Sequence, residues 1–196
     1  MAAGWHQFKA QTWLWVTTVQ FALFNLLTWA PYLLLGPVLA QQYLGGARAW
    51  GTVMAAMAFG SVLTGLLLVG RRPHRPLTLA VVGSYGYGMP CAMLALHLPL
   101  FAIALGACAA GAGSAVFSTY WSTVLQLRVP PEMLARVTAF ALTGSYALGS
   151  AGFVVIGPVA SVVGPGLMLG FAAAWTAVTS SVVLSLRAIR SVRLAE

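Results

Sequence analysis

Few side chains in this sequence could carry out covalent chemistry. Ser114, in the run Gly111-Ala-Gly113-Ser114-Ala115, is the most suggestive nucleophile. A serine needs a neighbouring base to act as one, and the last apolar stretch before Leu186 contains no histidine. The chain has no Asp, its three histidines are widely spaced, and it has no Gly-Lys-Ser phosphate loop. We therefore expect no catalytic residue, no bound metal and no cofactor.

Uncharged polar side chains inside the apolar stretches are better candidates for a site, because lipid offers them no partner. If residues 12–39 form a helix that turns by ~100° per residue, four such side chains fall within about 60° of one another: Thr18, Asn25, Trp29 and Tyr32. This strip could form part of a substrate-facing wall. The alternative is hydrogen bonding between helices, with Tyr32 in the aromatic belt at the membrane surface.

Two later stretches carry similar patterns. Polar and aromatic side chains share a helix face in each, and the sets are Ser114, Ser118 and Trp121, then Thr143, Tyr146 and Ser150. Small residues recur on other faces, namely Gly106, Ala110 and Gly113, then Ser145, Gly149 and Gly152. Small residues at this spacing let helix backbones approach closely, so we expect both small-residue sets to serve helix packing.

The composition indicates that lipid, rather than water, surrounds these apolar stretches. Of 196 residues, 60% are hydrophobic and 6% are charged, whereas a soluble domain carries roughly 25% charged residues. This composition excludes a soluble enzyme, a disordered chain and a disulfide-stapled secreted module. The net charge of +8 comes from short basic islands between apolar runs. That pattern is typical of membrane loops rather than of a nucleic-acid surface, so lipid and not nucleic acid is the expected partner.

The charged residues divide the chain into six crossings. The four uncharged intervals, from Lys9 to Arg187, contain 38, 22, 52 and 50 residues. Because a bilayer core takes about 20 helical residues, these intervals hold one, one, two and two helices. The expected spans are 12–39, 49–69, 77–96, 100–127, 134–156 and a last helix ending near 186. Pro31 and Gly36-Pro37 should loosen the end of the first, the turn 97–99 precedes the fourth, and Gly157-Pro158 with Gly164-Pro165-Gly166 should bracket the turn into the sixth.

The loops also predict the orientation. In a six-helix arrangement, nine of the ten Lys and Arg residues lie on one side, and only Arg48 lies on the other. The positive-inside rule then places both termini in the cytoplasm, with the protein in the cell membrane. We divide the chain into a linker-like cytoplasmic tail (1–11), a six-helix transmembrane bundle (12–186) and a basic cytoplasmic tail (187–196).

Several loop sequences resemble a known family. They read Gly65-Leu-Leu-Leu-Val-Gly-Arg71-Arg72-Pro-His-Arg75 after the second helix and Gln126-Leu-Arg128-Val-Pro130-Pro131-Glu132-Met-Leu-Ala-Arg136-Val137 between the fourth and fifth. Together with the aromatic-rich start, they resemble the C-terminal six-helix half of a major facilitator superfamily transporter, in the bacterial drug and siderophore exporter branch. Val69 stands where the family's loop motif has Asp.

The resemblance implies a function and a site. It implies an all-α membrane protein that forms one half of a secondary transporter and exports small amphipathic molecules by alternating access. In that family the first, second, fourth and fifth helices of a half line the cavity, which favours Asn25, Trp121 and Tyr146 as cavity-facing. It also makes Gly65, Arg71, Arg72, Arg75, Glu132 and Arg136 the cytoplasmic loop motif. A second half, or a second copy of this chain, would be the partner.

Three alternatives stay open. The chain could be a truncated, non-transporting fragment of such a transporter. A pore-forming subunit is disfavoured because no ring of charged residues could select ions. An intramembrane serine protease of the rhomboid type is disfavoured because the sixth helix lacks the histidine, and an aspartyl protease because the chain lacks Asp.

Overall fold

The computed structural model describes residues 12–71 and 73–186. This part of the chain contains helices and no strand. Six helices are long and apolar enough to cross a membrane: Thr12–Leu44, Ala47–Leu68, Pro76–Ala95, Leu100–Arg128, Pro131–Val163 and Pro165–Ser185. The expected all-α class and the six spans are confirmed, and the six apolar helices suggest a multi-pass membrane protein.

Two of the six crossings are subdivided. The first consists of α2 (Thr12–Phe24), a π-helical turn η1 (Asn25–Trp29), α3 (Ala30–Leu39) and a second π-helical turn η2 (Ala40–Leu44). The third consists of α5 (Pro76–Ser84), a 3₁₀ turn η3 (Tyr85–Tyr87) and α6 (Gly88–Ala95). The others are continuous, and they are α4 (Ala47–Leu68), α7 (Leu100–Arg128), α8 (Pro131–Val163) and α9 (Pro165–Ser185).

The first helix is longer than expected. It was predicted to end at Leu39, but η2 extends it to Leu44, and Pro31 and Pro37 both lie inside it. A proline has no N–H to donate to the preceding turn. The carbonyl that the N–H of Pro31 would have met belongs to Leu27, inside the widened turn η1. Pro37 lies inside α3 without ending it.

The predicted end of the fifth helix was wrong. Instead of ending at Ile156, α8 runs through Gly157 and Pro158 to Val163. One missing backbone donor at Pro158 costs less than breaking a helix in lipid, where freed carbonyls find no water. The turn into α9 therefore consists of Gly164 alone, whose φ of 94° is accessible to glycine without strain.

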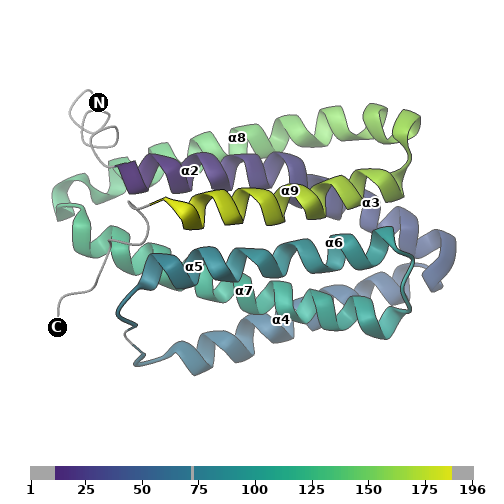
Figure 1. Cartoon of the computed structure of the whole chain (residues 1–196), viewed down its shortest axis with the longest axis horizontal. Helices are drawn as coiled ribbons and strands as arrows, with labels where there is room; N and C mark the ends of the chain where they lie inside the picture. The colour runs from purple at the N-terminus through teal and green to yellow at the C-terminus, as the bar shows by residue number, and fades with distance from the viewer. Residues whose placement is uncertain (1–11, 72, 187–196) are drawn as a thin grey trace.

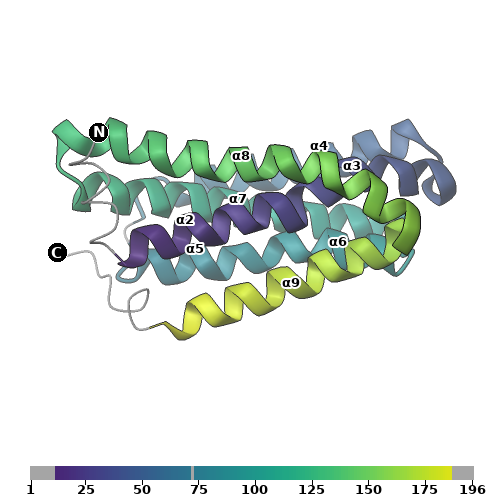
Figure 2. The same cartoon turned by 90° about the horizontal axis from the view of Figure 1, so that it is seen from above.

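Helices from the first three-helix half of the chain pack mainly against helices from the second half. Figures 1 and 2 show α7 alongside both α4 and the α5–α6 crossing, while the first crossing lies beside α8 and α9. Thus the first helix of each three-helix half packs against the second and third helices of the other half. The helix α8 contacts the first crossing closely and α7 only slightly, which leaves space between α7 and α8.

Glycines set the close approach of α7 to its neighbours. A methyl group added at Gly111 would overlap the carbonyl oxygen of Met57 on α4. One added at Gly113 would overlap the carbonyl oxygen of Gly83 on α5. The expected packing role of Gly113 is therefore confirmed, and α7 is held on two sides through backbone contact.

The helix α8 packs through a narrow stripe of small residues. Its buried positions are Val137, Ala141, Ser145, Gly149, Gly152, Ile156 and Ala160. A methyl group added at Gly152 would stand 3.0 Å from the Ala30 Cβ and 3.1 Å from the Leu26 carbonyl oxygen. The expected packing role of Ser145, Gly149 and Gly152 is confirmed, and most other residues of α8 are exposed.

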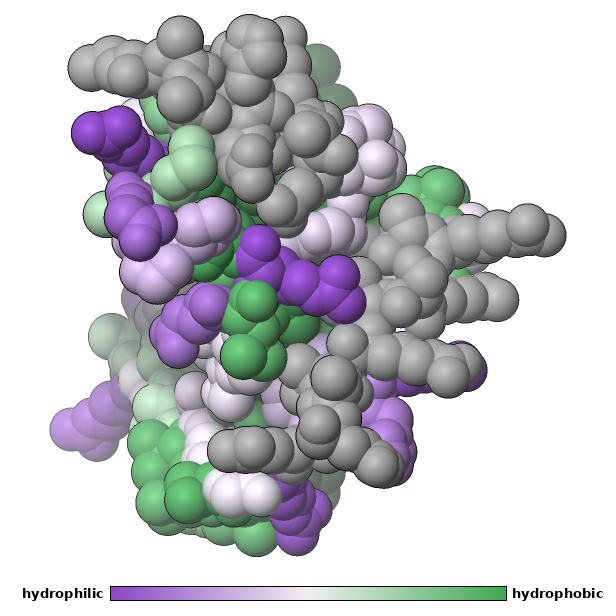
Figure 3. All heavy atoms as spheres, turned by 90° about the vertical axis from the view of Figure 1, so that its left-hand side faces the viewer, coloured by the Kyte–Doolittle hydropathy of each residue, from purple (hydrophilic) through white to green (hydrophobic). Residues whose placement is uncertain are grey.

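The basic residues of the described chain gather at one end. Arg71, Arg75, Arg128 and Arg136 lie in or beside the connections at the end where α2 begins and α9 ends. Figure 3 looks onto this end and shows hydrophilic side chains there beside apolar ones. Arg48 lies at the opposite end, in the first turn of α4. Arg72 and the two predicted tails, 1–11 and 187–196, fall outside the described residues. The predicted cytoplasmic location of this end stays a prediction.

Candidate functional site

A groove lies between α2, α7 and α8, where α7 and α8 barely touch. Its volume is about 440 Å³. Its wall consists of hydroxyl-bearing and aromatic side chains with a few aliphatic ones, namely Thr17, Thr18, Phe21, Tyr87, Ser114, Phe117, Ser118, Trp121, Ser122, Ala141, Leu142, Ser145 and Tyr146. We call this hollow the groove. None of the lining side chains carries a charge.

A second hollow of about 210 Å³ adjoins the groove nearer the middle of the helices. The two share four lining residues: Phe21, Tyr87, Ser114 and Tyr146. The second hollow adds Asn25 and Trp29 from η1 and Met57 from α4. Together the two hollows draw on the first, second, fourth and fifth helices, with Tyr87 as the contribution of the third.

Of the six predicted cavity residues, five line at least one of the two hollows and one does not. Ser118, Trp121 and Tyr146 line the groove, and Asn25, Trp29 and again Tyr146 line the adjoining hollow. Thr143 is exposed on α8 and lines neither. The groove wall on α8 is formed by Ala141, Leu142, Ser145 and Tyr146. Thr143 lies about 100° further round the helix than Leu142.

Asn25 sits where the first crossing meets α8. Its side chain is buried, and its amide nitrogen Nδ2 donates to the Phe21 carbonyl oxygen at 2.9 Å. Its Cβ lies against Gly149. This bond takes one of the two amide hydrogens, so Asn25 can meet a ligand through Oδ1 as an acceptor and through its second N–H as a donor.

An aromatic layer forms the floor of the groove. The ring of Phe21 stacks on that of Phe117, with centroids 5.7 Å apart, and meets Tyr146 edge-on at 6.3 Å. Beside it, the ring centroids of Phe24 and Tyr87 lie 4.5 Å apart. Phe21, Phe117 and Tyr87 were not predicted as site residues, because an aromatic side chain in an apolar run gives no signal that separates a groove wall from a lipid-facing position.

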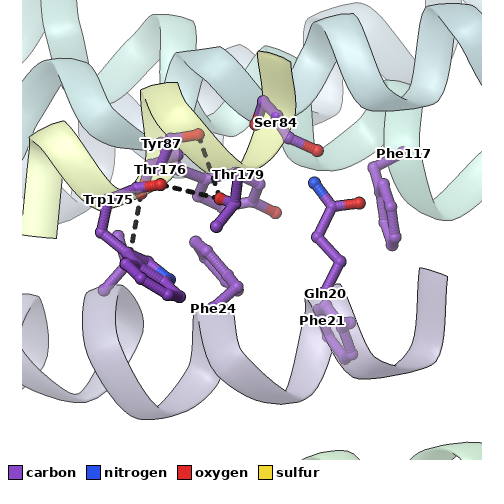
Figure 4. A pocket seen from close by; sticks show the side chains of 11 residues that line it. Gln20, Phe21, Phe24, Ser84, Tyr87, Phe117, Trp175, Thr176 and Thr179 are labelled. Carbon is purple, nitrogen blue, oxygen red and sulfur yellow. Dashed lines mark hydrogen bonds between the residues drawn. The ribbon is translucent and has the colours of Figure 1, made fainter. Parts of the chain in front are cut away.

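Behind this layer lies a small polar chamber between the first helix and α9 (Figure 4). Its volume is about 20 Å³. Thr28 and Thr176 share a hydrogen bond of 2.8 Å at its wall, whereas the buried atoms Gln20 Oε1, Trp175 Nε1 and Ser180 Oγ have no partner. The chamber shares Phe21, Tyr87 and Phe117 with the groove, so these rings separate the two spaces.

The end that bears Arg48 is filled by aromatic side chains. Tyr32 lies between Trp29 and Trp50, with ring centroids 5.9 and 5.2 Å away, and Trp50 covers Gly36. Tyr32 is buried in the bundle rather than placed in a surface belt. Tyr32 and Trp50 belong to an apolar cluster that occupies this end of the bundle, and Trp29, at its edge, also lines the adjoining hollow.

His97 lies in the turn before α7 at the same end. Its φ is 53°, and its ring lies 4.6 Å from that of Tyr43. The Tyr43 hydroxyl donates to the Leu94 carbonyl oxygen at 2.9 Å, which fixes this corner. His97 thus serves as a turn residue, remote from Ser114 in the groove.

The loop-motif residues lie outside the groove. Gly65 is in the last part of α4 with no atom within 4 Å of an added Cβ, so no contact within the chain requires glycine there. Arg71, Arg75 and Arg136 are exposed. Glu132 lies in the first turn of α8, where a carboxylate stabilises the positive end of the helix dipole.

Comparisons with protein families, with curated proteins and with solved structures found no match for this chain.

Proposed function

We propose that this chain forms one half of a secondary transporter of the major facilitator type and moves small amphipathic molecules by alternating access. The groove carries this proposal. It is a hollow within the span of the helices, its size suits a drug-like molecule, and its wall combines aromatic faces with hydroxyl groups. Such a wall binds molecules that are partly apolar and partly polar.

The crosswise packing of the helices supports the proposal. Exchange of the first helices between the two three-helix units suits a pair of structural repeats, which is how many secondary transporters are built. It brings the first and fourth helices to the centre, where their side chains form the floor of the groove.

The exposed helices α4 and α8 support a two-bundle machine. They are the least buried of the six crossings and both contribute to the hollows. The groove is walled by α2, α7 and α8 but is partly open, so a second bundle facing α4 and α8 would cover it. In this proposal the second bundle is another six-helix chain or a second copy of this one.

The distribution of filled and hollow regions fits one state of such a cycle. Apolar clusters pack both ends of the bundle, one at the end that bears Arg48 and one at the arginine-rich end, and the groove lies between them. Because both ends are packed here, alternating access requires rocking of the bundles to open each end in turn.

The groove offers substrate contacts rather than a proton carrier. Glu132 and Glu196 are the only acids of the sequence, and Glu132 lies at a helix terminus outside the groove. A proton-coupled version of this machine would therefore take its acidic residue from the second bundle.

Crosslinking and native sizing in the membrane test the proposal. We expect crosslinks from α4 and α8 to a second six-helix bundle, and dye transport by the reconstituted assembly. Robust transport by proven monomers would overturn the idea of a half. If neither a second bundle nor transport is found in the native membrane, the chain is the non-transporting alternative.

A further inference from the structure

We propose that the groove selects planar aromatic molecules that carry N–H or O–H donors and no negative charge. This inference rests on the proposed function, because it takes the groove as the substrate site. It names the chemistry of the ligand that the wall recognises.

The hydroxyl protons of the wall are largely committed to the helices themselves. Thr18 Oγ1 donates to the Leu14 carbonyl oxygen at 2.8 Å, and Ser145 Oγ donates to that of Ala141 at 2.7 Å. The same arrangement holds for three more lining residues, namely Thr17, Ser118 and Ser122. Five of the eight hydroxyl-bearing residues of the wall therefore spend their single proton on a backbone carbonyl.

Because these protons are already used, the wall can accept hydrogen bonds from a ligand more readily than it can donate them. A hydroxyl has one proton but two lone pairs, so an oxygen that donates to its own helix still accepts from a ligand. To donate to a ligand, it would first have to give up its backbone bond. Asn25, in the adjoining hollow, adds a further acceptor through Oδ1, while one of its two Nδ2 hydrogens is bonded to the Phe21 carbonyl oxygen. A ligand that supplies donors meets existing acceptors. Of the other hydroxyl-bearing residues, Ser114 and Tyr87 hydrogen-bond each other, so the donors left to a ligand are one of that pair, Tyr146 and the second N–H of Asn25.

The rings of the wall select the shape of the ligand. Phe21, Phe117, Trp121 and Tyr146 all line the groove, and Phe21 already stacks on Phe117. Aromatic faces favour planar rings in offset-stacked or edge-on contact. Their negative faces also attract a delocalised positive charge.

The absence of charge from the lining excludes anions. No lining residue of the groove is Lys, Arg or His, so a buried carboxylate or phosphate would lose its water without gaining a cation. The acceptor oxygens would add repulsion. A neutral or cationic ring system does not meet this cost.

Two dyes of the same shape test the inference. Proflavine is a planar cation with two amino groups that donate, and acridine orange is the same ring system with those amino hydrogens replaced by methyl groups. We would measure the binding of each to the purified full chain in lipid nanodiscs by dye anisotropy. We expect proflavine to bind more tightly by roughly 25-fold, since two lost hydrogen bonds each cost about a factor of five.

Matched serine variants locate the effect. We expect Ser118→Ala and Ser122→Ala to weaken proflavine binding by about fivefold each while leaving acridine orange within about a factor of two. Ser161→Ala is the control, because Ser161 makes the same kind of backbone bond, to the Pro158 carbonyl at 2.7 Å, on the exposed face of α8 away from the groove.

Each result has one reading. Equal affinities for the two dyes, or tighter binding of acridine orange, would overturn the donor preference and leave the transporter proposal standing. Binding of the anionic dye fluorescein as tightly as proflavine would overturn the exclusion of negative charge. Failure of both cationic dyes to bind at all would count against the groove as a substrate site and so against both proposals.

Discussion

Phe21 and Phe117 stack with their ring centroids 5.7 Å apart, and this contact joins α2 to α7 at the floor of the groove. Both residues line the groove on one side and the small polar chamber on the other. The pair is therefore a partition as well as a binding surface. Its removal should change the shape of the site without touching any polar group.

The first prediction concerns this partition. In Phe117→Ala the loss of the ring should merge the chamber with the groove and remove a stacking face. We expect proflavine affinity to fall by about tenfold, in line with an aromatic contact of roughly 1 kcal/mol beyond area burial. Anisotropy titration measures it. Phe101→Ala, at a ring that is 74% exposed on α7, should leave the affinity unchanged. An unchanged affinity in Phe117→Ala would mean that the dye binds elsewhere.

The first helix shows where sequence reasoning reached its limit. A uniform turn of ~100° per residue put Asn25, Trp29 and Tyr32 on one strip. The π-helical turn over Asn25–Trp29 changes that phase. Asn25 and Trp29 do line one hollow, but Tyr32 packs against Trp50 at the filled end. Local widening of a helix near a proline depends on tertiary packing and leaves no clear signal in the spacing of polar residues.

Other features were predictable because they follow from one-dimensional rules. The spacing of charges gave six crossings, since a bilayer fixes the length of a helix. The small-residue spacing identified Gly149 and Gly152 as packing positions, which the contact with Asn25 and Leu26 confirms. Phe21 and Tyr87 were not predicted as site residues. Whether an aromatic side chain contacts protein or lipid is decided only when the helices pack together.

The second prediction compares two glycines of α8. Gly152→Ala places a methyl group 3.0 Å from the Ala30 Cβ, so the helices must separate, whereas Gly157→Ala meets nothing within 4 Å. We expect Gly152→Ala to lower the free energy of unfolding by about 1–3 kcal/mol. Gly157→Ala should be neutral or stabilising by roughly 0.5–1 kcal/mol, because alanine is the better helix former.

Thermal unfolding of the two variants in the same detergent checks this pair. A decrease in the melting temperature of Gly157→Ala, or an unchanged melting temperature in Gly152→Ala, would contradict the packing of α8 against the first helix. Loss of stability in Gly157→Ala only when a second bundle is present would instead identify that face as an interface.

The third prediction concerns the polar chamber. Its volume of about 20 Å³ exceeds the roughly 10–15 Å³ that one water needs, and Trp175 Nε1, Ser180 Oγ and Gln20 Oε1 have unused hydrogen-bonding capacity at its wall. We expect an ordered water there. A cross-peak between water and the Trp175 indole N–H in NMR would report it, with Trp175→Phe to assign the signal. A chamber that stays dry would contradict the prediction.

The fourth prediction concerns sidedness. His74 lies in the connection between α4 and α5, at the end where Arg71 and Arg75 also lie, whereas His97 lies in the turn at the other end, near Arg48. In a variant without Cys91 and Cys108, we expect a cysteine placed at His97 to react with a membrane-impermeant maleimide in intact cells. A cysteine placed at His74 should react only after the membrane is opened. The reverse labelling pattern would place the basic end outside the cell, against the positive-inside rule.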